Sequence, residues 1–374
     1  MRNKAYDVIF YYPQHFNRSK EGTNPFFEPL ISLCEEKSLH YLLLEEPDNK
    51  TRFPKNKNAI QFDIYFYVIL FLRKITPLIF FKNYETREQW IGNSMKKITF
   101  NKFNSRTVFT LSNSMGGFWR GYNRKSRIID YQHGIIDKTQ PGFFNKGKVP
   151  SHISENNKEV AVWGKGFYDI FNQDKKYYKD KVHVLGYSEL NEQEKGTIQC
   201  ENKILFSLQF VPESGIDITQ KMLVKIKQEL EELNTLSQEK TPKVILRNHP
   251  RHNNVVDLTS LVNEFKFVSI MPENEVLSNQ DYFLHVTFYS TTAFEMAMKK
   301  IPTYFLITET ILYGNTFLQD YNYPITQNTS LKELFTLYQN DKAIRNAHVC
   351  LVKKWSNYYF QPINKNVFLK IIND

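Results

Sequence analysis

One segment, residues 283–306, constrains the fold of this chain more than any other. An apolar run that reads as a strand ends in Tyr-Ser-Thr-Thr at 289–292, a helical pattern follows, and a second strand pattern begins after Pro302. This order is typical of a parallel sheet covered by helices. Ser and Thr can cap the helix start, whose positive dipole end suits a phosphate. The segment predicts an α/β domain that holds either an anion site or an ordinary helix cap.

Strand and helix patterns alternate along the rest of the 374-residue chain as well. Strands are expected at residues 6–12, 41–44, 107–111, 127–131, 160–163, 182–185, 203–208, 243–247, 266–270, 282–287 and 303–307. The length suits two domains, and a polar, aperiodic stretch separates the halves. We therefore predict an α/β protein of two doubly wound, Rossmann-like domains that face a central cleft, because open α/β sheets bind ligands beyond the carboxyl ends of their strands.

The predicted domain boundaries follow these patterns. The first Rossmann-like domain covers residues 1–188, a linker covers 189–202, and the second Rossmann-like domain covers 203–350. Residues 351–374 form a helical tail that could pack back on the first domain.

Charge and hydropathy narrow the classes of partner and location. The net charge of +10 is spread along the chain beside no nucleic-acid-binding motif, so we expect an anionic ligand or membrane surface rather than nucleic acid. Three cysteines lie far apart and no apolar leader opens the chain, which predicts a cytoplasmic protein. The most apolar run, residues 65–72, is too short to span a bilayer and predicts a buried or interfacial helix within 62–81.

Three polar clusters stand where strands are expected to end. They are Asp-Tyr-Gln-His-Gly-Ile at 130–135, Arg-Asn-His-Pro-Arg-His at 247–252, and the segment 289–292 with Glu295 one helical turn later. A single histidine near a strand end is usually a structural residue. Three clusters divided between two domains favour a shared ligand site.

The same clusters carry a resemblance to a known family. Gln-His-Gly at 132–134, His-Pro at 249–250 and Ser-Thr-Thr at 290–292 resemble the motif set of GT-B glycosyltransferases. The nearest branch holds CDP-glycerol glycerophosphotransferases, capsule Kdo transferases and bacterial sialyltransferases. The resemblance implies a GT-B fold and a nucleotide-activated donor, often CMP- or CDP-linked, held by the C-terminal domain.

The resemblance also implies roles for individual residues. His249, followed by Pro250, matches the histidine that contacts the donor phosphate. The hydroxyl and N–H cluster on that phosphate is matched by Ser290, Thr291 and Thr292. Glu295 stands where many GT-B enzymes bind the donor ribose, although a helix-start carboxylate is also favoured by the dipole.

His133, between Gln132 and Gly134, matches the histidine of the Gln-His-Gly motif, and the resemblance implies that this histidine faces the acceptor. Two departures from the family pattern matter. The acidic motif of one sialyltransferase group is absent, and Gln132 stands where the glycerophosphotransferases usually have Trp. Neither sialic acid nor glycerol phosphate is therefore implied as the transferred group.

Chemical reasoning from the residues leads in the same direction. Glycosyl transfer needs a base for the acceptor hydroxyl and positive charge for the leaving phosphate. His133 has a suitable pKa for the base, while Asp137 or Asp130 could replace it or orient its ring. Arg247 and His249 supply positive charge. No Asp-x-Asp pair is present, so we expect no metal and no other cofactor.

The loop after the first expected strand is a further candidate on the acceptor side. It contains His15, Arg18 and Glu21, any of which could contact an acceptor, and His15 or Glu21 could be the base. A plain connection between strand and helix is the alternative.

These observations predict a cytoplasmic glycosyltransferase that builds a capsule, lipopolysaccharide or other surface polysaccharide. Its partners would be a nucleotide-sugar donor, a glycan or lipid-linked glycan acceptor, and peripherally the anionic inner face of the cytoplasmic membrane. A sugar-nucleotide epimerase of similar fold and a non-catalytic glycan- or nucleotide-binding protein are the alternatives.

Overall fold

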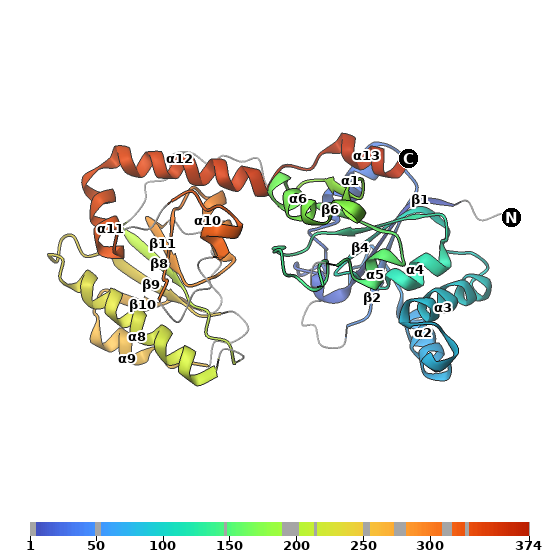
Figure 1. The fold of residues 1–374 in the computed structure, drawn as a ribbon, viewed down its shortest axis with the longest axis horizontal. Coiled ribbons are helices and arrows are strands. Elements are labelled where there is room, and N and C mark those ends of the chain that lie inside the picture. Colours follow the sequence, from blue (N-terminus) through green and yellow to red (C-terminus); the bar gives the residue numbers. More distant parts are fainter. Residues whose placement is uncertain are drawn as a thin grey trace. The chain divides into compact units, whose positions relative to one another are not determined.

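The computed structural model describes residues 5–48, 54–145, 148–188, 202–212, 215–249, 255–272, 282–308, 316–325 and 329–373. The chain forms two compact units. The first contains Met1–Glu192 and Tyr359–Asp374, and the second contains Gln193–Tyr358. Each unit is built on a parallel β-sheet with helices packed against it (Figure 1).

The first unit has a seven-stranded parallel sheet in the order β3-β2-β1-β4-β5-β6-β7. The strands are β1 (Tyr6–Pro13), β2 (Tyr41–Glu46), β3 (Ile60–Gln61), β4 (Ser105–Leu111), β5 (Arg127–Tyr131), β6 (Lys158–Val162) and β7 (Val182–Val184). The central strands are nearly continuous apolar runs because helices cover both faces. Strand order reverses between β1 and β4, which makes this the topological switch point of the sheet.

The helices of the first unit are η1 (Gln14–Phe16), α1 (Glu28–Glu36), α2 (Asp63–Ile75), η2 (Leu78–Phe80), α3 (Tyr84–Ile98), α4 (Gly116–Tyr122), α5 (Ser151–Ser154), α6 (Lys165–Phe171), η3 (Asn172–Asp174), α7 (Lys175–Tyr178) and α13 (Lys365–Asn373). The backbones of α3 and α4 approach closely. A Cβ on Gly121 would lie 1.9 Å from the carbonyl oxygen of Gln89, so this contact requires glycine.

The second unit has a five-stranded parallel sheet in the order β10-β9-β8-β11-β12. Its strands are β8 (Lys203–Ser207), β9 (Lys243–Arg247), β10 (Val268–Ile270), β11 (Leu284–Thr287) and β12 (Thr303–Phe305). Its helices are α8 (Gly215–Asn234), α9 (Thr259–Glu264), α10 (Thr292–Met298), the π-helical turn η6 (Thr316–Asp320), α11 (Leu331–Asn340) and α12 (Lys342–Tyr359). The switch point of this sheet lies between β8 and β11.

The end of the chain contacts the first sheet. Phe368 of α13 packs against Phe109 of β4, with 5.9 Å between ring centroids. The guanidinium of Arg127 donates to the carbonyl oxygen of Ile371 at 3.0 Å. The same guanidinium pairs with Glu159, whose carboxylate also contacts His183. Strands β5, β6 and β7 are thus tied together where α13 packs.

The expected fold class is confirmed, and two details of the first unit differ from expectation. The short strand β3 was not expected. The helix expected within 62–81 ends at Ile75, and Ile69 is its one buried residue. A buried helix was therefore the wrong alternative for this segment, since Ile64, Tyr67, Leu70, Phe71 and Ile75 are all exposed. No described helix is both long and apolar enough to cross a bilayer.

Candidate functional site

The second unit brings several predicted residues together at the carboxyl edge of its sheet. Arg247 ends β9, and one of its guanidinium nitrogens donates to the hydroxyl of Thr292 over 3.4 Å. The Thr292 hydroxyl also accepts from the Ser290 hydroxyl at 2.9 Å. These side chains lie beside the switch point between β8 and β11, where a doubly wound sheet binds its ligand.

Neighbouring residues at the start of α10 point in different directions. Ser290 is buried, and its hydroxyl accepts from the backbone N–H of Thr292 at 3.2 Å. Ser290 thus caps the helix from one residue before the N-cap position. Thr291 is exposed and makes no side-chain cap hydrogen bond. The buried hydroxyls therefore build the turn, and Thr291 is the hydroxyl open to a ligand.

Arg247 is a half-buried cation whose hydrogen-bonding capacity is only partly used by the described residues. Burial lowers the pKa of Arg247, and the carboxylate of Glu295 opposes that effect. A guanidinium has five N–H donors. Within the described residues, the guanidinium of Arg247 makes one hydrogen bond, to the hydroxyl of Thr292. Glu295 itself is exposed one turn into α10. Cation, exposed hydroxyl and exposed carboxylate are thus close to one another.

Of the His-Pro pair in the second cluster, the structure describes His249. His249 is half-buried and follows β9 by two residues. Pro250 lies outside the described residues.

His285, which sequence reasoning did not select, connects the strands of the second sheet near this carboxyl edge. His285 in β11 is completely buried, and its ring nitrogens contact the hydroxyls of Thr303 and Ser207, both at 2.9 Å. Burial, together with the charge of Arg247, lowers the pKa of His285 to about 3. His285 is therefore a neutral link across β8, β11 and β12. A polar residue in an apolar strand was the available signal.

In the first unit, His133 lies at the carboxyl edge of β5. The backbone N–H of Ser112 donates to Nδ1 of His133 at 3.3 Å, and Phe16 packs edge-on at 5.3 Å between ring centroids. Burial lowers the pKa of His133, Asp130 raises it, and His15 lowers it. The ring is therefore neutral near pH 7. Because Nδ1 accepts a hydrogen bond, the neutral tautomer in this arrangement carries its proton on Nε2.

The two aspartates near His133 make other hydrogen bonds. Asp130 is fully buried, and its Oδ1 accepts from the hydroxyl of Thr110 at 3.1 Å and the N–H of Asn113 at 2.6 Å. Asp137 accepts from the N–H of Thr139 at 2.6 Å. In this arrangement neither carboxylate hydrogen-bonds the His133 ring. Asp130 acts on it through space, and Asp137 shapes the turn that follows.

Gln132 uses both ends of its buried side-chain amide within the protein. Its NH₂ donates to the carbonyl of Gly134, and its oxygen accepts from the N–H of Trp163, both at 2.9 Å. These bonds hold the turn around His133 against the end of β6. A Cβ on Gly134 would meet no atom within 4 Å, so the space beside this residue is open.

The loop after β1 approaches His133 through the pair His15 and Phe16. The ring centroids of His15 and Phe16 are 4.5 Å apart, and His15 Nδ1 contacts the carboxylate of Asp48 at 2.7 Å. Arg18 is exposed and donates to the carbonyl of His15. Glu21 is exposed in the following turn. His15 is thus brought to the same edge as His133.

Glu46, at the end of β2, is a candidate that sequence reasoning missed. Its carboxylate accepts from the hydroxyl of Tyr11 at 2.5 Å and from that of Ser114 at 3.0 Å. Burial raises the pKa of Glu46, although both hydrogen bonds and the charges of Arg73 and His15 lower it. A carboxylate at the carboxyl end of a strand beside the switch point was the available signal.

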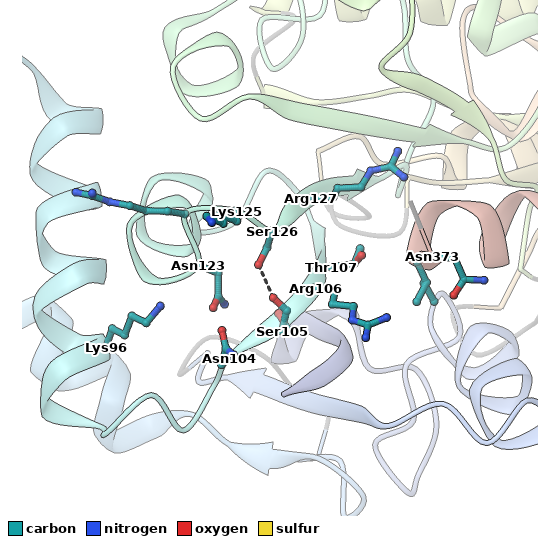
Figure 2. Close-up of a pocket in the computed structure, with 12 residues that line it drawn as sticks. Lys96, Asn104, Ser105, Arg106, Thr107, Asn123, Lys125, Ser126, Arg127 and Asn373 are labelled. Atoms are coloured by element: carbon teal, nitrogen blue, oxygen red, sulfur yellow. Dashed lines mark hydrogen bonds between the residues drawn. The ribbon is translucent and has the colours of Figure 1, made fainter. Parts of the chain in front are cut away.

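The first unit has a small cavity near the carboxyl edge of its sheet and a larger one at the amino edge. One of about 130 Å³ is lined by Asn113, His152 and Lys158 among others, beside the turn between β4 and α4. The other, of about 590 Å³, lies at the opposite, amino edge of β4 and β5 (Figure 2). Its lining includes the cations Lys96, Arg106, Arg124, Lys125 and Arg127. Among the described residues, no three His, Cys, Asp or Glu side chains are grouped to hold a metal ion.

Solved structures of other proteins share the fold of this chain. No protein-family profile and no curated protein matches the sequence. Solved structures do match it along nearly its whole length. The wall teichoic acid polymerase TagF is 12% identical, with a TM-score of 0.53, over 98% of this chain and 87% of TagF.

Two further structures match to a similar degree. The UDP-GlcNAc 2-epimerase from Methanocaldococcus jannaschii is 12% identical, with a TM-score of 0.56, over 98% of both chains. The pneumococcal O-GlcNAc transferase GtfA is 9% identical, with a TM-score of 0.54, over 99% of this chain and all of its own. At such identities the likeness shows the fold alone: two Rossmann-like domains of the GT-B type.

Proposed function

We propose that this protein is a glycosyltransferase that moves a sugar from a nucleotide-activated donor to a glycan acceptor. One observation carries the proposal: Arg247, a half-buried cation whose guanidinium makes one hydrogen bond among the described residues, lies near exposed Thr291 and Glu295 at the switch point of the second sheet. A diphosphate would accept from Arg247 and from the start of α10. Glu295, whose charge acts on Arg247, would accept from a ribose hydroxyl.

The named ligands of similar structures support a nucleotide-sugar donor. GtfA was solved in complex with UDP and GlcNAc. The UDP-GlcNAc 2-epimerase from Neisseria meningitidis, with a TM-score of 0.55 and 11% identity, was solved bound to UDP-GlcNAc. The motifs around His249 and Ser290 favour a CMP- or CDP-linked donor here. We propose that transfer needs no metal, because Arg247 and His249 supply the positive charge.

We assign the acceptor side to the first unit. His133, with His15 near it, would contact the acceptor hydroxyl, and Arg18 and Glu21 would extend the contact. For Nε2 of His133 to take the proton, the ring must first release the hydrogen bond from Ser112. The alternatives are that His133 donates from Nε2 and that Glu46, Asp137 or another carboxylate is the base. A lipid-linked precursor of capsule or lipopolysaccharide, at the inner face of the cytoplasmic membrane, is the acceptor we propose.

A sugar-nucleotide epimerase is the second candidate, because two of the similar structures are UDP-GlcNAc 2-epimerases. An epimerase converts its substrate without an acceptor. The test incubates the protein with CMP-, CDP- and UDP-linked sugars, with and without glycolipids extracted from bacterial membranes. Mass spectrometry then follows the nucleotide and the glycolipid.

The expected result is nucleotide release that depends on the acceptor, together with a glycolipid whose mass has increased by one sugar. An isomerised nucleotide sugar without acceptor would support the epimerase instead. Nucleotide binding with neither product would indicate a non-catalytic binding protein.

A further inference from the structure

Exposed apolar side chains are concentrated in one part of the first unit. Of the twenty large hydrophobic residues that are exposed in the described chain, thirteen lie between residues 60 and 100. This range contains α2, η2 and α3, and α2 packs against α3 (Figure 1). A soluble surface rarely leaves so many large apolar side chains together without a partner.

The helix α2 presents these residues in a regular stripe. Ile64, Tyr67, Phe71 and Ile75 are spaced three and four residues apart, which places them on one side of the helix, and all four are exposed. The opposite side faces the protein, where Arg73 pairs with buried Glu88 at 2.6 Å. The fold therefore fixes α2 with an apolar stripe directed outward.

The turn after α2 adds two further exposed apolar side chains. In η2, Ile79 is 86% exposed and Phe80 is 77% exposed. We call these six residues, Ile64, Tyr67, Phe71, Ile75, Ile79 and Phe80, the apolar face.

Within the segment that carries the apolar face, the exposed charged side chains have one sign, and exposed Glu155, which follows α5, contacts this segment at Asn83. The exposed charged residues between 63 and 102 are Lys74, Lys82, Lys97 and Lys102. Of the acidic residues in the same range, Glu85 and Glu88 are buried, and Asp63 is half-buried and paired with Lys55. Lys96 adds a cation and also lines the basic cavity of Figure 2. An apolar face whose own segment exposes lysines as its charged residues is complementary to an anionic, partly apolar surface.

We propose that the apolar face docks in the interfacial layer of an anionic lipid bilayer. Its aromatic and aliphatic side chains enter the boundary between headgroups and acyl chains, while the surrounding lysines contact lipid phosphates. The helix lies along the membrane and does not cross it. A second copy of this chain fits the surface less well, because a symmetric dimer would bring the same lysines into opposition. This inference stands independently of the proposed sugar transfer.

Vesicle flotation of the full-length protein tests the proposal. Vesicles contain either phosphatidylcholine alone or phosphatidylcholine with about 30 mol% of the anionic lipid phosphatidylglycerol. The main variant is Ile79→Glu. Its matched control is Ile216→Glu, because Ile216 is 76% exposed on α8 of the second unit. Both changes are on the surface, and circular dichroism and Tm verify that each variant folds.

The wild type should bind anionic vesicles and bind them less as salt is raised. Ile79→Glu should weaken this binding by at least about tenfold, whereas Ile216→Glu should leave it unchanged. The variant Lys74→Gln/Lys82→Gln should lose about fivefold per lysine at low salt and show a shallower salt dependence.

Three results would overturn the proposal. The first is equal vesicle binding by the wild type and Ile79→Glu. The second is no binding to anionic vesicles, or equal binding to neutral ones. The third is a wild-type dimer in solution that Ile79→Glu converts to a monomer, since a second copy would then cover the apolar face.

Discussion

At the scale of single residues, two adjacent hydroxyls at the start of α10 have different expected roles, one in helix stability and the other in ligand binding. Ser290 is buried and caps the helix, and Thr291 is exposed without a cap hydrogen bond. The sequence predicted both as ligands of a phosphate, because a Ser-Thr-Thr run does not reveal which hydroxyl faces inward. Only the path of the backbone between β11 and α10 decides this.

The pair Ser290→Ala and Thr291→Ala should therefore behave differently. Ser290→Ala should lower the free energy of unfolding by about 1 kcal/mol, because a helix N–H loses its acceptor. Thr291→Ala should change stability by less than about 0.5 kcal/mol and should weaken nucleotide binding by roughly tenfold or more. Thermal unfolding and calorimetric titration measure the two effects. Equal nucleotide affinity in Thr291→Ala and the wild type would remove Thr291 from the donor site.

The base on the acceptor side is the second question at this scale. If His133 accepts the proton, His133→Ala should lower kcat by about 10²–10⁴-fold while the donor Kd stays nearly unchanged. Glu46→Gln and Asp137→Asn are the comparisons, since each removes a carboxylate charge with little change in shape.

The pattern across these variants identifies the base. A large loss in Glu46→Gln with near-normal turnover in His133→Ala would show that Glu46 is the base. If Asp137 only orders the loop, Asp137→Asn should lose less activity than His133→Ala.

At the scale of elements, the buried link through His285 joins three strands beneath the donor residues. Its hydrogen bonds to Ser207 and Thr303 cross from β11 to both neighbouring strands. Sequence patterns predicted these three strands, because continuous apolar runs between helices are typical of parallel sheets. They could not predict the partners of His285, which depend on strand register. The sequence left open whether the helix within 62–81 is buried or interfacial for a similar reason, since apolar content alone does not distinguish an inward from an outward face.

Folding stability should depend on pH through His285. The unfolded state takes up a proton near the ordinary pKa of 6.5, whereas the folded state resists protonation until about pH 3. The stability contributed by neutral His285 is therefore fully present above pH 6.5 and is lost as the pH falls toward 3. The slope from this group is at most about 1.4 kcal/mol per pH unit.

Urea unfolding of the wild type and of His285→Gln between pH 5 and 7.5 measures this contribution. Glutamine keeps a donor and an acceptor but does not titrate, so the difference in stability between the two proteins should narrow as the pH falls below 6.5. A difference that is constant with pH would show that His285 does not carry the effect.

At the scale of the whole molecule, the order of strand and helix patterns was enough to predict two doubly wound domains. Each switch point then follows from strand order, and the clusters at Arg247 and at His133 both lie on carboxyl edges of their sheets. Glu46 escaped prediction because two consecutive glutamates end β2. Glu45 is fully buried among its own hydrogen bonds, whereas Glu46 accepts from Tyr11 and Ser114. The pleat of β2 and the neighbouring loops decide which of the two carboxylates faces the carboxyl edge of the sheet.

The most direct test of the account is nucleotide binding by the wild type and Arg247→Ala, measured by thermal shift and calorimetry in the presence of EDTA. CMP, CDP, UDP and GDP and their sugars are compared, because a ligand of the native state raises Tm. The account predicts that at least one pyrimidine nucleotide raises the Tm of the wild type without metal. Arg247→Ala should bind it about 10- to 100-fold more weakly with its fold intact, since a charge-assisted hydrogen bond to phosphate is lost. Failure of every nucleotide and nucleotide sugar to bind at millimolar concentration, or equal affinity in Arg247→Ala, would contradict it.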